Sequence, residues 1–563
     1  MNRFSMIPRV NLPRSSFDMS YSHSTSLNNG YLIPVVCREV YPGDTFSINQ
    51  SHVLRLASSL VTPMMDNLEV KTEWFFVPNR LLWEHWVNMM GEQEDPDDSI
   101  DYLAPTLTIS ANCQTWVPGS ILDYFGVPAN STAIPNYSLE INALPLRAYW
   151  KIYQDWYKDE NLCKSQKRIV TDLFPSPTIP QQSVVNLFGR GDVSANLSTL
   201  TEAQFKKVFR LAKRAKKHDY FTSCLPWPQK GPGVELPLGN SAPVVSSGDP
   251  VKMGWTGAST GGNVALGVLA LTSSSVPNYL FLGQNGVNRV NFGKEGDTTT
   301  GLYTDLSSAS AATINSIRQA FQLQKFYEQC ARGGSRYTEI VRSFFGVVSP
   351  DARLQRSEYL GGYSAPLQVQ SVPQTSATDA TSPQANLAAF GVSSSVNKCF
   401  SRSFTEHGFI IALASVVSKP SYQQGLDRMF SRKGRFDYYA PVFAHLGEQA
   451  VLNKEIYASN AVDNEKVFGY QERFAELRFN NNLITGQMRS THALSLDSWH
   501  LAQEFDSLPK LNSDFIEENA PIDRVVAVGS GTGADQFLIN FYFDIKAVRV
   551  MPVYGVPGLV DHF

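Results

Sequence analysis

Three glycines near the C-terminal end form the motif most suggestive of chemistry. Gly529, Gly531 and Gly533 follow the apolar run 525–528, an arrangement that resembles the start of a dinucleotide-binding loop. Such a loop must open a helix, because the helix N-terminus binds the pyrophosphate. From Phe537 onward, however, apolar and polar residues alternate with a period of two, which predicts a strand. A glycine-rich hairpin therefore fits the motif better than a nucleotide site.

Other arrangements that would support catalysis or metal binding are weaker. The sequence holds no G-x-x-x-x-G-K-[ST], H-E-x-x-H or G-x-S-x-G motif, and its nine histidines are widely spread, which favours a structural role for each. The acidic run from Glu92 to Asp101 could hold a hard cation, but it lacks the spacing of a calcium loop, so a solvated acidic loop is the simpler interpretation. We therefore predict no enzyme active site, no cofactor and no metal site.

The densest charged feature is a basic run in a predicted helix. A capping box of Thr201 and Gln204 begins a helix predicted over residues 201–217. Clustered cations bind polyanions by releasing counterions, although a solvated helix face is the alternative. Three arginines of the N-terminal segment are further candidates. The candidate DNA contacts are therefore Arg3, Arg9, Arg14, Lys206, Lys207, Arg210, Lys213, Arg214, Lys216 and Lys217.

Strands are predicted toward both ends of the chain. Residues 45–57 follow a Pro-Gly turn, and residues 68–76 alternate apolar with charged side chains, the period of a half-buried strand. Residues 409–417 form an apolar run, residues 474–479 are another candidate, and residues 537–545 alternate. These patterns predict a fold built mainly of β-strands.

Helices and irregular segments are predicted between these strands. The aromatic residues of 147–157 fall on one helical face, and residues 312–345 keep a helical period that Gly333 and Gly334 interrupt. Residues 364–398 are rich in Ser, Thr, Gln, Ala and Pro, which predicts an extended loop. Residues 1–30 lack periodicity, which predicts an arm that crosses onto a neighbour or lines an interior, or else a frayed terminus.

The block of residues 232–311 differs in character from its surroundings. Glycine is dense, charge is sparse, and short strand-like runs lie between turns. A unit so rich in glycine cannot easily bury its own apolar runs. Apolar runs that stay exposed usually mark contacts. We predict that the block projects outward and meets its copies around a threefold axis. The candidate contact residues are Leu266, Val268, Leu269, Leu271, Leu280, Phe281 and Leu282.

Composition limits the class of protein. The 563 residues are 43% hydrophobic, which allows a large core, and the net charge of −3 means that any nucleic-acid contact requires a local basic patch. Only 18% of residues are charged and 12% are aromatic, a balance that suits large buried interfaces. The N-terminus lacks the apolar core of a signal peptide, and no apolar run approaches the roughly 20 residues of a membrane helix. We therefore expect a soluble protein of a cytosol without membrane insertion.

Four stretches carry a family resemblance across nearly the whole chain. They are FFVPNRLLWEHW at 75–86, LPLRAYWKIYQDWYKDENL at 144–162, SIRQAFQLQKFYEQCARGGSRYTEIVRSFFGVVSPDARLQRSEYLGG at 316–362, and MPVYGVPGLVDHF at 551–563. Together they resemble the major capsid protein of the Microviridae, small bacteriophages with circular single-stranded DNA. The third stretch is the most specific. The insertion before it is similar to the gokushovirus branch, in which a threefold-clustered protrusion replaces separate spike proteins.

The resemblance implies an eight-stranded antiparallel jelly roll of the viral capsid type, with long helical and loop insertions. It implies roughly 60 copies in a T = 1 icosahedral shell around a circular single-stranded DNA genome, with the protrusion used in host attachment. The implied partners are other copies of the chain, the genome, an internal scaffolding protein, a DNA pilot protein, a small basic DNA-binding protein and a host surface receptor. The implied location is the virion, after assembly in the cytoplasm of a host bacterium.

Four segments follow from these observations. They are an extended basic N-terminal arm (1–30), the first jelly-roll strands with helical insertions (31–231), an inserted Gly-rich surface protrusion (232–311), and a helical segment with the remaining jelly-roll strands (312–563). A viral polysaccharide-binding tail or fibre protein is the alternative, and it would show repeats and a paired-carboxylate cleft. A host β-rich hydrolase would show a nucleophile motif. Neither set of features is apparent in the sequence.

Overall fold

The computed structural model describes most of the chain and divides it into two compact units. One unit comprises residues 1–228 and 333–563, and the other comprises residues 229–332. The described residues are 13–110, 117–129, 138–192, 194–197, 200–234, 314–334, 337–346, 355–376, 378, 383–459, 461–529 and 534–554, with five short strands between residues 244 and 304.

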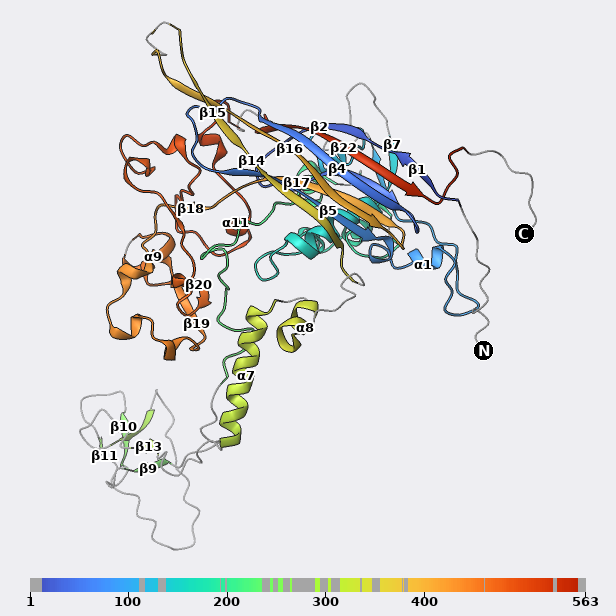
Figure 1. The fold of residues 1–563 in the computed structure, drawn as a ribbon. Coiled ribbons are helices and arrows are strands. Elements are labelled where there is room, and N and C mark those ends of the chain that lie inside the picture. Colours follow the sequence, from blue (N-terminus) through green and yellow to red (C-terminus); the bar gives the residue numbers. More distant parts are fainter. Residues whose placement is uncertain are drawn as a thin grey trace. The chain divides into compact units, whose positions relative to one another are not determined.

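Two antiparallel sheets dominate the larger unit (Figure 1). The first sheet has the order β1 (Ser15–Asp18), β22 (Phe537–Arg549), β4 (Thr45–Leu56), β16 (Leu387–Ser403) and β15 (Gln368–Pro373), and β2 (Tyr21–Leu27) also pairs with β22. The second sheet has the order β14 (Glu358–Pro366), β5 (Leu68–Pro78), β17 (Gly408–Ser418) and β3 (Ile33–Val40). Side chains of both sheets share one apolar core.

Buried and exposed side chains alternate along strand β22. Phe537, Phe541 and Phe543 are fully buried, whereas Leu538 and Tyr542 between them are about half exposed. Successive side chains of a strand point to opposite faces, so one face of β22 enters the core between the two sheets. The strand pairs with β4 on one side and with β1 and β2 on the other.

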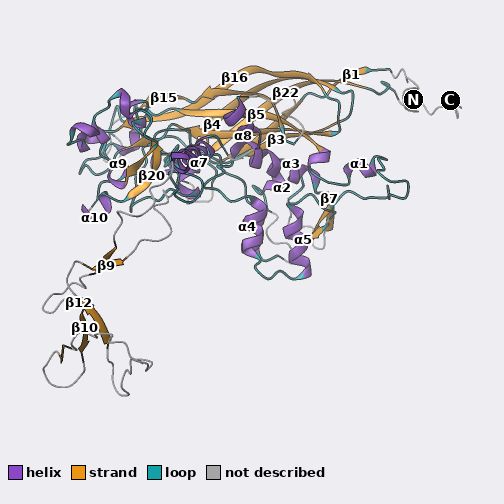
Figure 2. Ribbon diagram, turned by 90° about the horizontal axis from the view of Figure 1, so that it is seen from below, coloured by secondary structure: helices purple, strands orange, loops and turns teal. Residues whose placement is uncertain are grey.

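A layer of helices covers the outer face of the second sheet (Figure 2). Strand β17 is buried along its whole length because Ile410 and Ala412 face the core between the sheets, while Phe409 and Ile411 face the helices. The layer is built from α2 (Ile121–Tyr124), α3 (Leu144–Ile152) with a π-helical turn (Tyr153–Tyr157), α4 (Gln166–Leu173), α5 (Ile179–Leu187) and α6 (Glu202–Val208).

Shorter elements complete the larger unit. Residues 419–528 form a third apolar cluster around Phe468 and Phe515 together with the segment of Tyr220 and Phe221. The remaining helices are α1 (Trp86–Met89), α8 (Tyr337–Phe345), α9 (Asn453–Ile456), α10 (Ala461–Asn464) and α11 (Ser513–Ile516), and the remaining strands are β6 (Thr106–Ser110), β7 (Ser138–Asn142), β8 (Ala195–Asn196), β18 (Ser421–Tyr422), β19 (Glu448–Leu452), β20 (Val467–Glu472) and β21 (Asn482–Leu483).

The smaller unit combines short strands with one long helix, α7 (Ile314–Arg332). Strand β10 (Lys252–Thr256) pairs with β11 (Val264–Ala265) and β12 (Arg289–Gly293), and β9 (Val244–Ser246) pairs with β13 (Leu302–Thr304). This unit spans residues 229–332, whereas the insertion predicted from the sequence is 232–311 and leaves α7 outside. Its outward projection stays a prediction.

The mainly-β fold and several elements are confirmed. Strands are present at the predicted positions 45–57, 68–76, 409–417 and 537–545. Helices are present where 147–157 and 312–345 predict them, with a break near Gly333 and Gly334. Most of these segments carry the period of a strand or a helix, and 409–417 is a short apolar run of the kind that forms a strand buried on both faces.

Four predictions about local structure are wrong. The helix predicted over 201–217 ends at Val208, because the following residues are extended and form bridges at Lys213 and Ala215. The loop predicted over 364–398 holds β15 and most of β16, whose polar side chains face outward from a paired ladder. The strand candidate 474–479 contains a 3₁₀ turn. The arm predicted over 1–30 is too long, since β1 and β2 pair with β22.

A polar network lies inside the core between the sheets. The amide of Gln50 donates to the Tyr363 hydroxyl over 2.7 Å and accepts from the indole of Trp74 over 3.2 Å. His52 Nδ1 lies 2.7 Å from the same Tyr363 hydroxyl, and the His52 side chain is 2% exposed. Burial lowers the pKa of His52 from 6.5 to about 4, so this imidazole is neutral in the folded protein at neutral pH.

Stability should fall in acid through His52. The unfolded chain binds this proton below about pH 6.5, whereas the folded chain binds it only below about pH 4. The contribution is therefore complete above pH 6.5 and is lost as the pH falls toward 4, by at most about 1.4 kcal/mol per pH unit. His52→Gln should flatten the pH dependence of the unfolding free energy in this window. His218→Gln, at an exposed position, is the control, and an equal pH dependence in wild type and His52→Gln would contradict the prediction.

Candidate nucleic-acid interface

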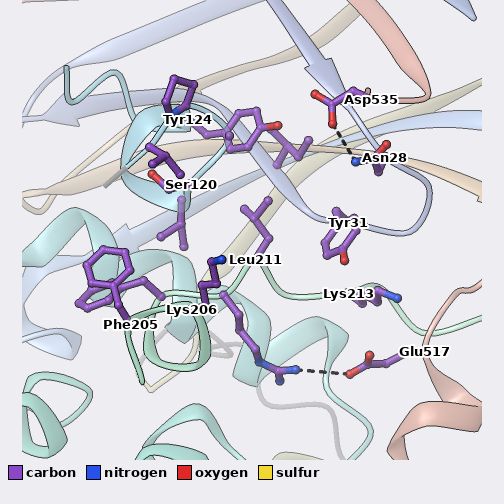
Figure 3. A pocket seen from close by; sticks show the side chains of 17 residues that line it. Asn28, Tyr31, Ser120, Tyr124, Phe205, Lys206, Leu211, Lys213, Glu517 and Asp535 are labelled. Carbon is purple, nitrogen blue, oxygen red and sulfur yellow. Dashed lines mark hydrogen bonds and ion pairs between the residues drawn. The ribbon is translucent and has the colours of Figure 1, made fainter. Parts of the chain in front are cut away.

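A pocket in the larger unit brings together three of the basic residues predicted to contact DNA. Lys206 lies in α6, and Arg210 and Lys213 lie in the extended segment that follows it. The pocket has a volume of about 450 Å³. In Figure 3, Lys206 and Lys213 lie in the lower half of the view, opposite Tyr124 and Asp535.

Aromatic side chains form much of the pocket wall. Tyr31 precedes β3, Tyr124 ends α2, and Phe205 and Phe209 come from α6 and the residue after it. The Lys213 ammonium lies 5.2 Å from the centre of the Tyr31 ring, within range of a cation–π interaction. The Tyr124 hydroxyl donates to a backbone carbonyl over 3.0 Å, and burial raises its pKa to about 12. The pocket thus offers cations beside neutral aromatic rings.

Two carboxylates reduce the positive charge of the pocket. Glu517 lies 3.7 Å from the Arg210 guanidinium, and burial raises the pKa of Glu517. Asp535 accepts from the side-chain amide of Asn28 over 2.8 Å. Three cations against two carboxylates leave a small positive excess, and such an excess attracts a phosphate.

Two other members of the basic run have structural partners. Arg214 donates to both oxygens of Glu73, over 2.6 and 3.2 Å, and its guanidinium lies 5.3 Å from the Tyr157 ring centre. Burial alone would raise the pKa of Glu73, but Arg214, the Tyr157 hydroxyl and Lys71 together outweigh this effect and lower it. Lys216 is 5% exposed, donates to the Phe515 carbonyl over 2.8 Å, and has its pKa lowered to about 8 by burial.

The remaining predicted site residues are scattered. Lys207 and Lys217 are exposed. Arg14 is also exposed, and it donates to the Gly43 carbonyl and to Thr45 Oγ1 at the turn between β3 and β4. Outside the described residues lie Arg3 and Arg9, together with the protrusion candidates Leu266, Val268, Leu269, Leu271, Leu280, Phe281 and Leu282.

Sequence reasoning missed the aromatic half of the pocket. Tyr31 and Tyr124 are far from the basic run in the sequence, and no local pattern joins them to it. It also missed residues 427–446, where apolar side chains are exposed at high density. That segment does carry a sequence signal, because arginine and aromatic residues interleave from Arg428 to Tyr439.

The acidic run and the glycine motif were the other features of the sequence that could have formed a site. The acidic run forms an exposed loop in which Asp98 accepts from the backbone amides of Glu94 and Asp95. Within the described residues, no cluster of His, Cys, Asp and Glu suits a metal ion, and no helix has the length and apolar character to span a membrane. Of the glycine motif, Gly529 is described and the residues 530–533 are not.

Arg214 should prove to be a stability residue. Arg214→Met leaves the Glu73 carboxylate without its arginine partner in a largely buried site, and we expect a loss of about 3–5 kcal/mol in the unfolding free energy. Adding Glu73→Met should recover much of that loss. Lys207→Met, at an exposed position earlier in the same basic run, should change stability by less than about 0.5 kcal/mol. Denaturant unfolding measures all four proteins, and an unchanged stability of Arg214→Met would contradict the assignment.

Comparison with known proteins places the chain in a family. The model of the family described as capsid protein (F protein) matches residues 5–559. Capsid protein VP1 of Bdellovibrio phage phiMH2K is 42% identical, with 100% of this chain and 98% of the relative covered. Capsid protein VP1 of Chlamydia phage 1 is 40% identical (99% and 98% covered), and that of Spiroplasma virus 4 is 37% identical (99% and 97% covered).

These three viruses are gokushoviruses, so the resemblance to the Microviridae and to that branch is confirmed. The family is a structural one, whose members belong to the virus particle. With full-length relatives near 40% identity, the same role extends to this chain. The chain therefore belongs to the capsid protein (F protein) family and is a major capsid protein.

Proposed function

We propose that this capsid protein folds as an eight-stranded jelly roll and assembles in roughly 60 copies into a T = 1 icosahedral shell around circular single-stranded DNA. The strand order carries the jelly-roll part of the proposal, and the copy number and the genome rest on the membership of the family. A jelly roll interleaves its chain between two sheets by means of two Greek keys. The order of strands in the larger unit can therefore be compared directly with that pattern.

Eight strands of the two sheets fit the pattern. Along the chain they are β2, β3, β4, β5, β14, β16, β17 and β22. One sheet has the order first, eighth, third, sixth, and the facing sheet has the order fifth, fourth, seventh, second. Strand β15 then extends the edge of the first sheet by pairing with β16. This alternation supports a jelly roll with long insertions, the wall element of many small viral shells.

Particle mass tests the shell directly. Roughly 60 copies of a 62.5 kDa chain should give an empty shell of about 3.8 MDa. Charge-detection mass spectrometry of purified empty shells measures this value. A mass that corresponds to a larger shell, or to open sheets without a defined mass, would contradict the T = 1 assignment and leave the family membership untouched.

The genome contact is proposed for the pocket of Lys206, Arg210 and Lys213. A capsid protein must accept whatever DNA is packaged, so phosphate contacts and base stacking suit it better than hydrogen bonds to base edges. The pocket supplies cations beside the rings of Tyr31 and Tyr124, which is the chemistry of sequence-independent single-strand binding. Arg3, Arg9 and Arg14 of the N-terminal segment are proposed as further contacts.

Neutralising the pocket should weaken DNA binding and its salt dependence. Lys206→Gln with Lys213→Gln removes two cations, and each lost phosphate contact should reduce the slope of log K against log salt by roughly 0.7 for a single strand. Oligonucleotide binding to the purified protein at several salt concentrations measures the slope. Lys510→Gln, exposed and outside the pocket, is the control. A slope that changes equally in the control and the pocket variant would count against this site.

The remaining functions rest on the family. The insertion 232–311 is proposed to project from the shell, to meet its copies around the threefold axis and to attach the particle to a host surface receptor. Assembly is proposed to take place in the host bacterial cytoplasm with an internal scaffolding protein, a DNA pilot protein and a small basic DNA-binding protein. The smaller unit formed by residues 229–332 supports a separate role for this part of the chain.

A further inference from the structure

An exposed apolar segment precedes β19, and we call residues 427–446 the aromatic segment. It contains three 3₁₀ turns, at 428–431, 435–437 and 441–443. Monomeric proteins rarely expose large apolar groups at such density, and contiguous patches of them mark contact surfaces. Seven of its large apolar side chains are more than half exposed: Met429, Phe430, Phe436, Tyr438, Tyr439, Val442 and Leu446.

Two arginines anchor the aromatic segment to buried carboxylates of the larger unit. Arg428 donates to Glu455 over 2.9 Å and to a backbone carbonyl over 2.8 Å, and Arg432 donates to Glu476 over 3.0 Å. Both carboxylates are almost fully buried. The exposed aromatic side chains are therefore presented on an anchored backbone, and pre-organisation of this kind lowers the entropy cost of binding.

The charges of the segment favour a protein partner over DNA. Two of its four cations, Arg428 and Arg432, are occupied by the buried carboxylates. Asp437 accepts from two backbone amides of its own turn. Lys433 and Arg435 are left as the exposed cations. Two cations among seven apolar groups are too few to track a phosphate backbone, but they can orient a contact with a surface of carboxylates.

A surface of that chemistry is present on the same chain, at residues 90–103. Glu94, Asp95 and Asp97 are exposed there. They lie between large apolar side chains that are also exposed, namely Met90, Ile100 and Leu103, and Leu103 is 89% exposed. The acidic segment 90–103 therefore combines apolar groups with the charge opposite to that of Lys433 and Arg435.

The two segments cannot meet within one copy. Segment 90–103 follows α1, and the aromatic segment precedes β19 and α9. In both Figure 1 and Figure 2, α1 lies at the opposite end of the larger unit from α9 and β20. Complementary surfaces at opposite ends of a protein make head-to-tail contacts, which close into rings when the rotation between copies allows it.

We propose that the aromatic segment of one copy docks on the acidic segment 90–103 of a neighbouring copy in the shell. Phe430, Phe436 and Val442 bury their side chains against Met90 and Leu103 of the neighbour. Lys433 and Arg435 face the neighbour's carboxylates and set the register of the contact. The inference rests on the proposed closed shell and names the surface that closes it.

A charge exchange in the full-length protein tests the contact. The first variant is Lys433→Glu with Arg435→Glu, and the second is Asp95→Lys with Asp97→Lys. Each should raise the protein concentration needed for shell assembly by about tenfold, which corresponds to a loss of about 1.4 kcal/mol. The four changes combined should restore assembly toward wild type. Sedimentation and circular dichroism distinguish unassembled folded protein from unfolded protein. Because the two variants change different segments, misfolding of one leaves the other as a valid test.

A mismatched exchange provides the control. Lys433→Glu and Arg435→Glu combined with Asp506→Lys and Asp514→Lys carry the same total charge, but the lysines lie at other exposed positions. This protein should assemble no better than the first variant. Equal recovery by matched and mismatched combinations would overturn the proposal, as would wild-type assembly of all variants.

Loss of retained DNA without loss of shells would make the genome the partner of the aromatic segment, and it would also overturn the proposal. Phe430→Ser with Val442→Ser tests the apolar half separately, with the same expected loss of assembly. If wild-type protein forms no closed shell, the proposed function is wrong. That result is distinct from failure of the proposed contact, because it is seen in the wild-type protein before any variant is examined.

Discussion

The position of β22 between β2 and β4 is the constraint on which the larger unit depends. The thirteen residues of β22 pair with β4 along almost their whole length and with β1 and β2 along the other edge. Strands from the two ends of the chain thus become neighbours, and six alternate side chains of β22 enter the core. Contacts of such large sequence separation form slowly in folding, so the sandwich closes only after the chain is nearly complete.

The pairing of β22 with β2 also shapes the candidate DNA pocket. Asn28 directly follows β2 and Asp535 lies just before β22, and their side chains are hydrogen bonded over 2.8 Å. The opposite wall depends on the helical layer. The buried Tyr149 hydroxyl donates to the Leu32 carbonyl over 2.8 Å and accepts from the Ala212 amide over 2.9 Å. This hydroxyl, together with the direct hydrogen bond from the Leu32 amide to the Ala212 carbonyl over 2.9 Å, holds the segment that carries Arg210 and Lys213 against the start of β3.

Strong local periodicity made much of this fold predictable. The alternation from Phe537 and the apolar run of β17 predict strands because each pattern reflects burial that the backbone geometry requires. Residues 209–217 look helical, yet they are extended because bridges to Tyr31 and Glu517 outweigh their helix propensity. Strands β15 and β16 are polar on their outer faces, so composition alone indicated a loop.

The site was less predictable than the fold. Charge density identified Lys206, Arg210 and Lys213, but it equally identified Arg214, whose partner Glu73 lies on a strand far away in the sequence. The aromatic wall comes from segments that only tertiary structure joins. Family resemblance supplied the capsid role, which no local motif could have indicated, because a shell protein needs surfaces rather than a catalytic constellation.

An image reconstruction of the intact particle, at a resolution that traces the chain, tests the central claim most directly. That claim is that the sandwich closed by β22 forms the shell wall and turns the pocket of Lys206, Arg210 and Lys213 toward the genome. We predict that, in each copy, β22 lies between that copy's own β2 and β4 and that the pocket opens to the interior. A pocket that opens to the outer surface, or a β22 strand supplied by a neighbouring copy, would contradict it.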